Sequence, residues 1–458
     1  MELGGKTVVV VGLARSGVAA AELLARRGAR VVATDRKPEG ELEQEALSLR
    51  DKGVRLEAGG HRTATFRAAD LVVVSPGVPW DAPELVAARA AGVPVIGELE
   101  LGYRFLKGTV AAVTGTKGKS TTTAALGAML REAGGDVRVG GNIGTAVTGL
   151  VEGSTAATTF VLEVSSFQLE ASDTFHPRVA VFLNLSADHL DRHASFEEYA
   201  RAKARIFAHQ QGDDWAVVNA DDAGVLALAA QARARQLPFS PAGVAGDGAF
   251  FEGGHARLRL DGGTEILFRR DEVRLPGAHL AVDLLAAAAA ARVLGSPVEA
   301  IGRAVRGFRG VEHVLEHVAE VGGVAFFNDS KATNLDAARK SLESFDTPLL
   351  VILGGRYKGG DFADLAPALA QRGRAVLAIG ESRDRVARAL SGTVPVVSCD
   401  SLRDAVEGAL ARAQPGDTVL LAPACSSFDM FRDYAERGRA FKEEVRRLAE
   451  RLTKEGRR

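Results

Sequence analysis

The chain has 458 residues, and at about 150 residues per domain this length predicts roughly three domains. Hydrophobic residues make up 46% of the chain and charged residues 25%, as is usual for a globular protein with sizeable cores. The net charge of -1 provides no basic field for nucleic acid or an acidic membrane, so neither is an expected partner. The presence of only 2 cysteines argues against a disulfide framework and favours a reducing cytoplasm.

Neither a targeting segment nor a membrane span is expected. The apolar run at residues 8–13 is short and has no basic segment before it, so it predicts a strand rather than a signal peptide. The alanine run at residues 286–291 lies between Asp283 and Arg292, which leaves too short an uncharged stretch to cross a bilayer. This run predicts instead a helix face of small residues that packs closely.

The first third of the chain alternates short β-branched runs with helical stretches. The runs at residues 8–11, 31–33 and 71–74 predict buried parallel strands. Helical periodicity over residues 18–27 connects the first two runs. This βαβ pattern predicts a parallel sheet, with a boundary near residues 95–97.

The rest of the chain repeats the α/β pattern twice. A second unit begins with the apolar run at residues 110–113, and a third begins near residues 307–310. Glycines and alternating residues between positions 240 and 276 predict hairpins, and a helix is expected over residues 279–294. Further apolar runs predict strands at residues 160–162, 179–182, 349–353, 376–379 and 419–421.

Residues 111–121, Ala-Ala-Val-Thr-Gly-Thr-Lys-Gly-Lys-Ser-Thr, predict a strand, a tight turn and the start of a helix. Backbone N–H groups in such a turn converge on an anion, and the helix N-terminus adds partial positive charge. Lys119 is placed to neutralise β- and γ-phosphates, and Ser120 to ligate Mg²⁺. A strict phosphate loop has glycine at Val113, but the strand–turn–helix context predicts phosphate binding. The loop residues predicted to bind ATP are Gly115, Thr116, Lys117, Gly118, Lys119, Ser120 and Thr121.

Two polar positions follow apolar runs of this second unit. Glu163 ends the run at residues 160–162, and a carboxylate at a strand's carboxyl end beside a phosphate loop is well placed for Mg²⁺. A sheet-edge glutamate facing water is the alternative. His189 lies in the polar loop at residues 184–192, where site residues are common, although a lone histidine is more often structural.

Tyr199, Lys203 and Phe207 are spaced four residues apart and therefore share one face of a helix. This spacing alone favours a packed stripe in which the lysine ammonium reaches solvent.

The segment at residues 12–17, Gly-Leu-Ala-Arg-Ser-Gly, resembles the dinucleotide-binding fingerprint. Asp35 and Arg36 end the next expected strand, where a ribose-binding acid would lie. By itself this pattern favours an NAD-dependent oxidoreductase. The middle glycine of the fingerprint, which lets the backbone approach a pyrophosphate, is Ala14 here, and an oxidoreductase leaves the phosphate loop unexplained.

The loop Thr-Gly-Thr-Lys-Gly-Lys-Ser at residues 114–120 is similar to the phosphate loop of the Mur ligase family, in which position 117 is usually Asn. The resemblance implies an α/β protein with three domains. These are an N-terminal Rossmann-like domain that binds UDP over residues 1–97, a central P-loop ATPase-like domain over residues 98–308, and a C-terminal Rossmann-like domain over residues 309–458. Further matching segments lie at residues 140–144, 163–169, 184–192, 199–206, 328–334, 354–362 and 423–431.

The same resemblance implies an ATP-dependent, amide-forming ligase of cytoplasmic peptidoglycan precursor synthesis. Its expected substrates are ATP, D-glutamate and UDP-N-acetylmuramoyl-L-alanine, which react through an acyl phosphate. Two Mg²⁺ ions are the expected cofactors, and the expected form is a monomer. Large closing motions of the domains are also expected.

The resemblance implies a role for individual residues. The implied catalytic residues are Lys119, Glu163, His189 and Lys203. The implied metal ligands are Ser120, Glu163, His189 and Lys203, the last as a carbamate. The implied contacts of the UDP substrate are Ser16, Asp35, Arg36, Gly77, Asn142 and His189. Further implied ATP contacts are Asp283, Asp329 and Lys331. The implied D-glutamate contacts are Thr333, Lys358, Ser427 and Phe428, with Tyr434 as a weaker neighbour.

The chain departs from the family pattern where adenosine is commonly bound. Leu280 and Asp283 stand at positions that are usually Asn, and Val314 stands where Arg is frequent. These departures keep a non-catalytic nucleotide-binding scaffold open as an alternative. Another Mur-type ligase and a folylpolyglutamate synthase are further alternatives, against which the N-terminal nucleotide fold and the pair Lys358 and Ser427 argue.

Overall fold

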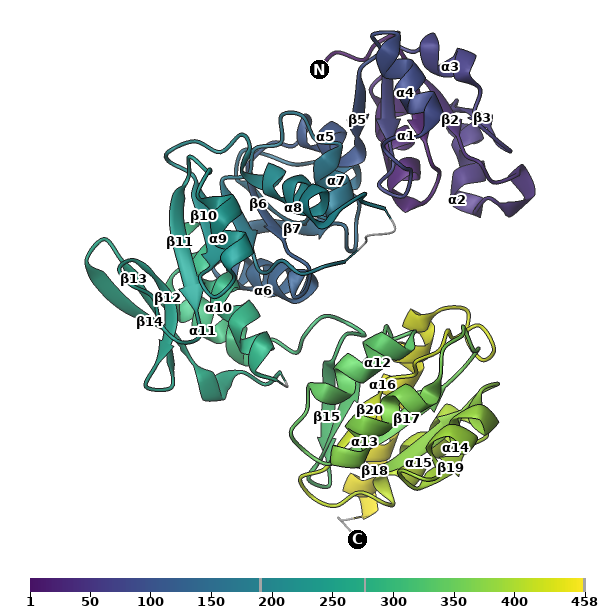
Figure 1. Ribbon diagram of the computed structural model, residues 1–458, viewed down its shortest axis with the longest axis vertical. Helices are drawn as coiled ribbons and strands as arrows, with labels where there is room; N and C mark the ends of the chain where they lie inside the picture. Colours follow the sequence, from purple (N-terminus) through teal and green to yellow (C-terminus); the bar gives the residue numbers. More distant parts are fainter. Residues whose placement is uncertain (189–191, 276, 456–458) are drawn as a thin grey trace. The chain divides into compact units, whose positions relative to one another are not determined.

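The computed structural model describes residues 1–188, 192–275 and 277–455 (Figure 1). It has two compact units, one made of Met1–Glu272 with Val282–Arg306 and the other of Val273–Ala281 with Gly307–Arg458. The first unit contains a five-stranded and a nine-stranded sheet, and the second contains a six-stranded sheet. In the described ranges, no helix combines the length and the apolar character that crossing a bilayer requires.

The first sheet has the strand order β3-β2-β1-β4-β5, and its strands are parallel. The expected strands are confirmed as β1 (Thr7–Val11), β2 (Arg30–Thr34) and β4 (Leu71–Val74), with α1 (Arg15–Arg26) between the first two. Alternate valines of β1 enter two different cores, one on each face of the sheet, which explains the unbroken apolar run. The other elements here are β3 (Arg55–Glu57), β5 (Val95–Gly97), η1 (Glu39–Glu41), η2 (Ser48–Lys52), α2 (Gln44–Leu47), α3 (Thr63–Arg67) and α4 (Pro83–Ala90).

The second sheet has the order β14-β13-β12-β11-β10-β9-β6-β8-β7. The strand before the phosphate loop, β6, therefore lies inside the sheet between β9 and β8, and both pairings are parallel. The strands are β6 (Thr109–Thr114), β7 (Asp136–Gly141), β8 (Thr158–Glu163), β9 (Val179–Phe182), β10 (Trp215–Asn219), β11 (Arg235–Ser240), β12 (Gly248–Glu252), β13 (His255–Leu260) and β14 (Gly263–Arg269). The carboxyl ends of β6, β8 and β9 meet at one edge, which brings their following loops together.

The hairpins expected between positions 240 and 276 are confirmed as β12, β13 and β14, which pair antiparallel. Residues of positive φ form the two turns, Gly253 and Gly254 in the first and Asp261 and Gly262 in the second. β12 also pairs parallel with β11, so the hairpins extend the main sheet.

The helix α10 of this unit carries the alanine run that the sequence singled out. The side chains of the alanine run at residues 286–291 have no exposed surface, which confirms the expected close packing of small residues. The helices and 3-10 turns of this part are α5 (Glu98–Tyr103), α6 (Lys119–Glu132), η3 (Val147–Leu150), α7 (Ser166–Glu170), α8 (Phe196–Ala204), η4 (Arg205–Phe207), α9 (Ala223–Ala229), η5 (Arg270–Glu272), α10 (Ala278–Val293) and α11 (Val298–Gly307).

The sheet of the second unit has the order β15-β16-β20-β17-β18-β19, with β15 antiparallel at one edge. Its expected strands are confirmed as β17 (Leu349–Gly354), β18 (Gly373–Ile379) and β20 (Thr418–Leu421). The long helix α16 (Tyr434–Glu455) packs against β15 and β16, and α15 packs against β17, β18 and β20 (Figure 1). The other elements are β15 (Glu316–Val321), β16 (Val324–Asn328), β19 (Val396–Ser398), η6 (Phe362–Leu365), α12 (Leu335–Glu343), α13 (Ala366–Arg372), α14 (Arg383–Leu390) and α15 (Leu402–Leu410).

Candidate active site

The phosphate loop connects β6 to α6 as the sequence predicts. Gly115 and Gly118 have φ of 151° and 80°, which glycine adopts without a steric penalty. A side chain at Gly118 would also overlap the Asp283 carboxyl group. The Lys119 Nζ donates to the carbonyls of Gly115 and Thr116 at 2.9 and 2.8 Å, so its ammonium lies over the loop.

Asn184, which follows β9, fixes the first half of the loop. Its Oδ1 accepts from the backbone N–H groups of Thr116 at 3.1 Å and Lys117 at 2.8 Å. Its Nδ2 donates to the Lys117 carbonyl at 3.1 Å. The sequence placed Asn184 in a polar motif without giving it a function, because its pairing to the loop depends on β9 lying beside β6.

Glu163 ends β8, directly beside the phosphate loop. Its side chain is only 2% exposed, so the alternative of a sheet-edge glutamate facing water is wrong. Ser120 Oγ donates to Glu163 Oε2 at 2.7 Å, and Asn142 Nδ2 donates to Oε1 at 2.7 Å. Asn142, which the sequence assigned to the UDP substrate, thus orients the carboxylate.

The hydroxyl of Ser120 and the carboxylate of Glu163 are hard oxygen donors of the kind that Mg²⁺ prefers. Such a pair suits a Mg²⁺ ion whose remaining ligands are phosphate oxygens and water. In the described part of the chain, no group of three or more His, Cys, Asp or Glu side chains gathers as a metal site. His189, which is also an implied metal ligand, lies outside the described residues.

Lys203 is buried next to the same loop. Its side chain is 2% exposed, so the expected stripe with an ammonium in solvent is wrong. The Nζ donates to the Gly115 carbonyl at 2.8 Å and lies 4.8 Å from the centroid of the Tyr199 ring. Burial and the neighbouring Lys119 ammonium lower the pKa of Lys203 to about 7. A large fraction of this amine is therefore neutral and nucleophilic near neutral pH.

Asp283 on α10 also lies against the loop, where a Cβ added at Gly118 would overlap its Oδ1. It is 7% exposed, and its Oδ2 has no hydrogen-bond partner within the described residues. Burial raises the pKa of Asp283 to about 7. The Asp283 carboxyl group therefore titrates in the same pH range as the Lys203 amine.

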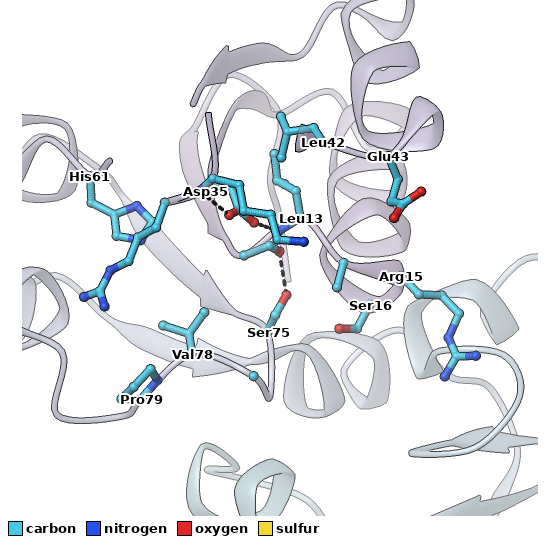
Figure 2. Close-up of a pocket in the computed structure, with 15 residues that line it drawn as sticks. Leu13, Arg15, Ser16, Asp35, Leu42, Glu43, His61, Ser75, Val78 and Pro79 are labelled. Carbon is cyan, nitrogen blue, oxygen red and sulfur yellow. Dashed lines mark hydrogen bonds between the residues drawn. The ribbon is translucent and has the colours of Figure 1, made fainter. Parts of the chain in front are cut away.

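A cavity of about 450 Å³ opens at the carboxyl ends of the first sheet (Figure 2). It lies at the position where open α/β sheets bind nucleotides, between β1 and β4, whose chain connections run in opposite directions. The structure brings four of the residues expected at the UDP substrate into its lining. These are Ser16, Asp35, Arg36 and Gly77.

Asp35 and Ser75 shape the floor of this cavity, as Figure 2 shows. Asp35 accepts from Leu13 N at 2.7 Å and from Lys37 N at 2.9 Å, so its carboxylate fixes the β1–α1 turn. Ser75 Oγ donates to the Gly12 carbonyl at 2.7 Å. A side chain at Gly17 would overlap that carbonyl, which explains the final glycine of the fingerprint.

In the second unit, the expected segments follow the neighbouring strands β16, β20 and β17. Arg356 and Ser426 exchange backbone hydrogen bonds of 2.9 and 3.2 Å, which tie together the loops that carry Lys358 and Ser427. The Ala424 N–H donates to the Ala332 carbonyl at 2.9 Å. This hydrogen bond ties the segment of Lys331 and Thr333 to the segment that carries Ser427. Ser427 is buried, whereas the Phe428 side chain is 59% exposed.

The segment at residues 328–334 ends at the start of α12. The N-cap of this helix is Asn334, whose Oδ1 accepts from Ala337 N at 2.8 Å. Asp329 accepts from the Ser341 hydroxyl, and burial raises the pKa of its carboxyl group to about 6. Ser330 Oγ donates to the Tyr434 carbonyl at 2.7 Å.

Arg437 is a residue that the sequence did not single out. It is 1% exposed, and it donates to the Ser330 hydroxyl and carbonyl at 3.0 and 2.9 Å and to the Cys425 carbonyl at 3.1 Å. Arg437 therefore connects the segment at residues 328–334 to the segment at residues 423–431. The only sequence signal is its position on the apolar face of α16, four residues before the buried Phe441.

The domain models of one enzyme family match all three parts of the chain. Residues 6–97 match the Mur ligase MurD-like N-terminal domain, residues 113–291 the Mur ligase middle domain, and residues 315–425 the Mur ligase glutamate ligase domain. The chain belongs to the Mur ligase family. It is therefore an ATP-dependent ligase, and the expected three-domain α/β fold is confirmed. The family match decides against the two alternatives of an NAD-dependent oxidoreductase and a non-catalytic nucleotide-binding scaffold.

Particular relatives extend over nearly the full length. A protein of Acidobacterium capsulatum named UDP-N-acetylmuramoylalanine–D-glutamate ligase is 51% identical over 447 residues, which cover 97% of each chain. A protein of Geotalea daltonii with the same name is 45% identical over 449 residues, covering 98% of this chain and 99% of that one.

Solved structures of the family share the fold. The UDP-N-acetylmuramate-alanine ligase of Thermotoga maritima has a TM-score of 0.57 at 21% identity, covering 96% of this chain and 99% of that one. The MurF ligase of Thermotoga maritima in complex with ADP has a TM-score of 0.56 at 17% identity, covering 98% of this chain and 96% of that one.

Proposed function

We propose that this protein joins D-glutamate to UDP-N-acetylmuramoyl-L-alanine with cleavage of ATP, as a cytoplasmic monomer in peptidoglycan precursor synthesis. The names of relatives that match along almost the whole chain support this substrate pair. The observation that carries the ligase chemistry is the Ser120–Glu163 pair, 2.7 Å apart, beside the phosphate loop and Lys119. The two cysteines, both free and buried, agree with a reducing compartment.

The reaction has two steps. A carboxylate oxygen of the alanyl group attacks the γ-phosphorus of ATP, the bond from phosphorus to ADP breaks, and an acyl phosphate forms. The D-glutamate amine then attacks the acyl carbon, the carbon–oxygen bond to phosphate breaks, and the amine loses its proton. Lys119 and the N–H groups of the loop stabilise negative charge during phosphoryl transfer, which is the main way proteins accelerate this reaction.

We assign Mg²⁺ to Ser120 and Glu163, where it would supply positive charge beside the transferred phosphoryl group. A second Mg²⁺ would be held by His189 and by Lys203 after carbamylation. In that modification the neutral lysine amine adds to the carbon of CO₂ and loses a proton, which leaves an oxygen-donating carboxylate-like group. The burial of Lys203 and the pKa of about 7 support it, because a charged ammonium cannot add to CO₂.

The three substrates are assigned to three parts of the chain, with proposed boundaries at residues 1–97, 98–308 and 309–458. The cavity of Figure 2 would bind the UDP moiety through Ser16, Arg36 and Gly77, with Asp35 shaping the turn. ATP would bind at the loop, assisted by Asp283, Asp329 and Lys331. D-glutamate would bind through Thr333, Lys358, Ser427 and Phe428.

Phosphate release in the presence of UDP-N-acetylmuramoyl-L-alanine, ATP and a panel of amino acids tests this function. We expect release only with D-glutamate, and a loss of at least about 100-fold in Lys119→Ala because charge stabilisation is removed. Lys52→Ala, at an exposed lysine paired with Glu22, is the matched control and should retain activity. Release that requires a different amino acid would assign the protein to another ligase activity.

A further inference from the structure

Arg192 connects the wall of the nucleotide cavity to the segment that follows β9. Its Nη1 donates to the Gly77 carbonyl at 3.1 Å, and its Nη2 donates to the Val78 carbonyl at 3.4 Å. Gly77 and Val78 form the turn after β4, and both line the cavity. A side chain from the segment between β9 and α8 therefore binds backbone carbonyls of a turn of the first sheet.

The other side of the Arg192 guanidinium rests on an aromatic stack that leads to the phosphate loop. Its central carbon lies 4.6 Å from the centroid of the Phe167 ring. The Phe167 ring is stacked on the buried His193, with centroids 5.2 Å apart and an interplanar angle of 12°. His193 lies 5.5 Å from the Tyr199 ring, and the Tyr199 hydroxyl is 3.0 Å from Thr116 Oγ1 in the loop.

Each link of this stack is fixed by a further contact. His193 Nε2 lies 3.0 Å from Ser166 Oγ at the start of α7. Thr116 is held by Asn184, and Tyr199 by its position on α8. Glu170 on α7 interacts electrostatically with Arg192. The turn at Gly77 and Val78 is thus held, through packed rings, at a defined distance from the loop that binds the triphosphate.

Only arginine can make both contacts at once. A planar guanidinium lies flat on a ring while its two Nη groups reach two neighbouring carbonyls. A lysine keeps the positive charge but has a single donor group, which cannot serve both carbonyls in the same geometry.

We infer that Arg192 is a positioning residue that aligns a substrate bound in the nucleotide cavity with the phosphate loop, so that the acceptor carboxylate meets the transferred phosphoryl group. This inference rests on the proposed function. UDP alone occupies only the cavity and does not need the alignment. The whole UDP substrate must span from the cavity to the loop, and misplacing reacting groups by about 1 Å can cost about 100-fold in rate.

The test compares Arg192→Lys and Arg192→Ala with the unaltered full-length protein. We expect kcat/KM for UDP-N-acetylmuramoyl-L-alanine to fall about 10- to 100-fold in both variants. The Kd for UDP, measured by calorimetry, and the KM for ATP should stay within about twofold, and Tm within about 2 °C. A purely structural function of Arg192 would instead lower Tm or weaken all ligands together.

Arg27→Lys is the matched control. Its guanidinium also rests on a ring, 5.0 Å from the Phe105 centroid, and reaches an acceptor, Glu152, at 3.4 Å, but it does not line the cavity. We expect this variant to keep kcat/KM within about twofold. Unchanged kcat/KM in Arg192→Lys, or an equal loss of UDP affinity, would overturn the inference. If the unaltered protein shows no D-glutamate-dependent phosphate release, the proposed function itself fails before any variant is compared.

Discussion

Two buried ionisable side chains flank the phosphate loop with opposite pKa shifts. Lys203 and Asp283 both have a pKa of about 7, the first lowered from 10.5 and the second raised from 3.8. Burial is the largest cause of both shifts, because removal from water disfavours the charged form of either group. Near pH 7 both groups are therefore partly protonated. The Lys203 ammonium and the neutral Asp283 carboxyl group predominate at lower pH, and the neutral amine and the carboxylate predominate at higher pH.

The carbamate assigned to Lys203 leads to a rescue experiment. Lys203→Ala should lose at least about 100-fold in ligase rate, because a proposed metal ligand is removed. Formate, acetate or propionate should restore part of the rate by placing a carboxylate in the vacated space. Lys119→Ala is the control, and no acid should restore it, because a cation is missing there. Failure of all three acids would remove the main support for the carbamate.

Asp283 makes stability depend on pH. Its folded pKa of about 7 lies above the ordinary value of 3.8, so the folded chain holds the proton more tightly. The stability that this proton provides is complete below pH 3.8 and is lost as pH rises through about 7. Asp283→Asn, which resembles the protonated form, should therefore gain stability relative to the unaltered protein between pH 5 and pH 8, on the order of 2 kcal/mol. A difference that does not change with pH in denaturant unfolding would contradict this.

At the scale of elements, the β6–α6 connection owes its shape to glycine. Gly118 has φ of 80° and faces Asp283, whereas Gly134 after the same helix has φ of 88° and open space around it. A side chain would therefore be strained by the backbone at both positions, and it would lack steric room only at Gly118.

Gly118→Ala should weaken ATP binding at least about 10-fold, because the added carbon overlaps Asp283 and shifts the loop away from its N–H geometry. Gly134→Ala should cost only the backbone strain, about 1 to 2 kcal/mol of stability, and should leave the Kd for ATP unchanged. Equal ATP affinities of the two variants, measured by calorimetry, would show that contact with Asp283 does not shape the loop.

Local patterns predicted most of these elements. Valine runs indicated β1 and β4, and the glycine pattern indicated the phosphate loop, because burial and turn geometry act over a few residues. Long-range contacts escaped prediction. The Arg437–Ser330 hydrogen bonds join residues 107 positions apart, and the Ser341 hydroxyl that donates to Asp329 comes from the helix α12 that follows this segment. The deep burial of Lys203 depends equally on the packing of α8 over the loop.

At the scale of the whole molecule, the chain divides its chemistry between two compact units. The nucleotide cavity and the phosphate loop belong to the first unit, and the segments with Lys358 and Ser427 belong to the second. Binding of UDP in the cavity of the first unit is therefore expected to respond separately to substitutions at Lys358 or Ser427 in the second.

Lys358→Ala tests this separation. We expect the KM for D-glutamate to rise at least about 10-fold, because a charge-assisted hydrogen bond to a carboxylate is lost. The Kd for UDP and the KM for ATP should not change. Lys340→Ala, which removes an exposed lysine paired with Asp336 in the same unit, is the control and should behave as the unaltered protein does. A rise in KM for ATP that equals the rise for D-glutamate would contradict the assignment.

The most direct measurement follows the oxygen atoms of the reaction. UDP-N-acetylmuramoyl-L-alanine labelled with ¹⁸O in its carboxylate is incubated with ATP, Mg²⁺ and D-glutamate, and the released phosphate is analysed by mass spectrometry. If the carboxylate attacks the γ-phosphorus at the phosphate loop, each amide formed leaves one labelled oxygen on phosphate. Unlabelled phosphate would mean that ATP is cleaved by water, and this would contradict acyl phosphate formation by this protein.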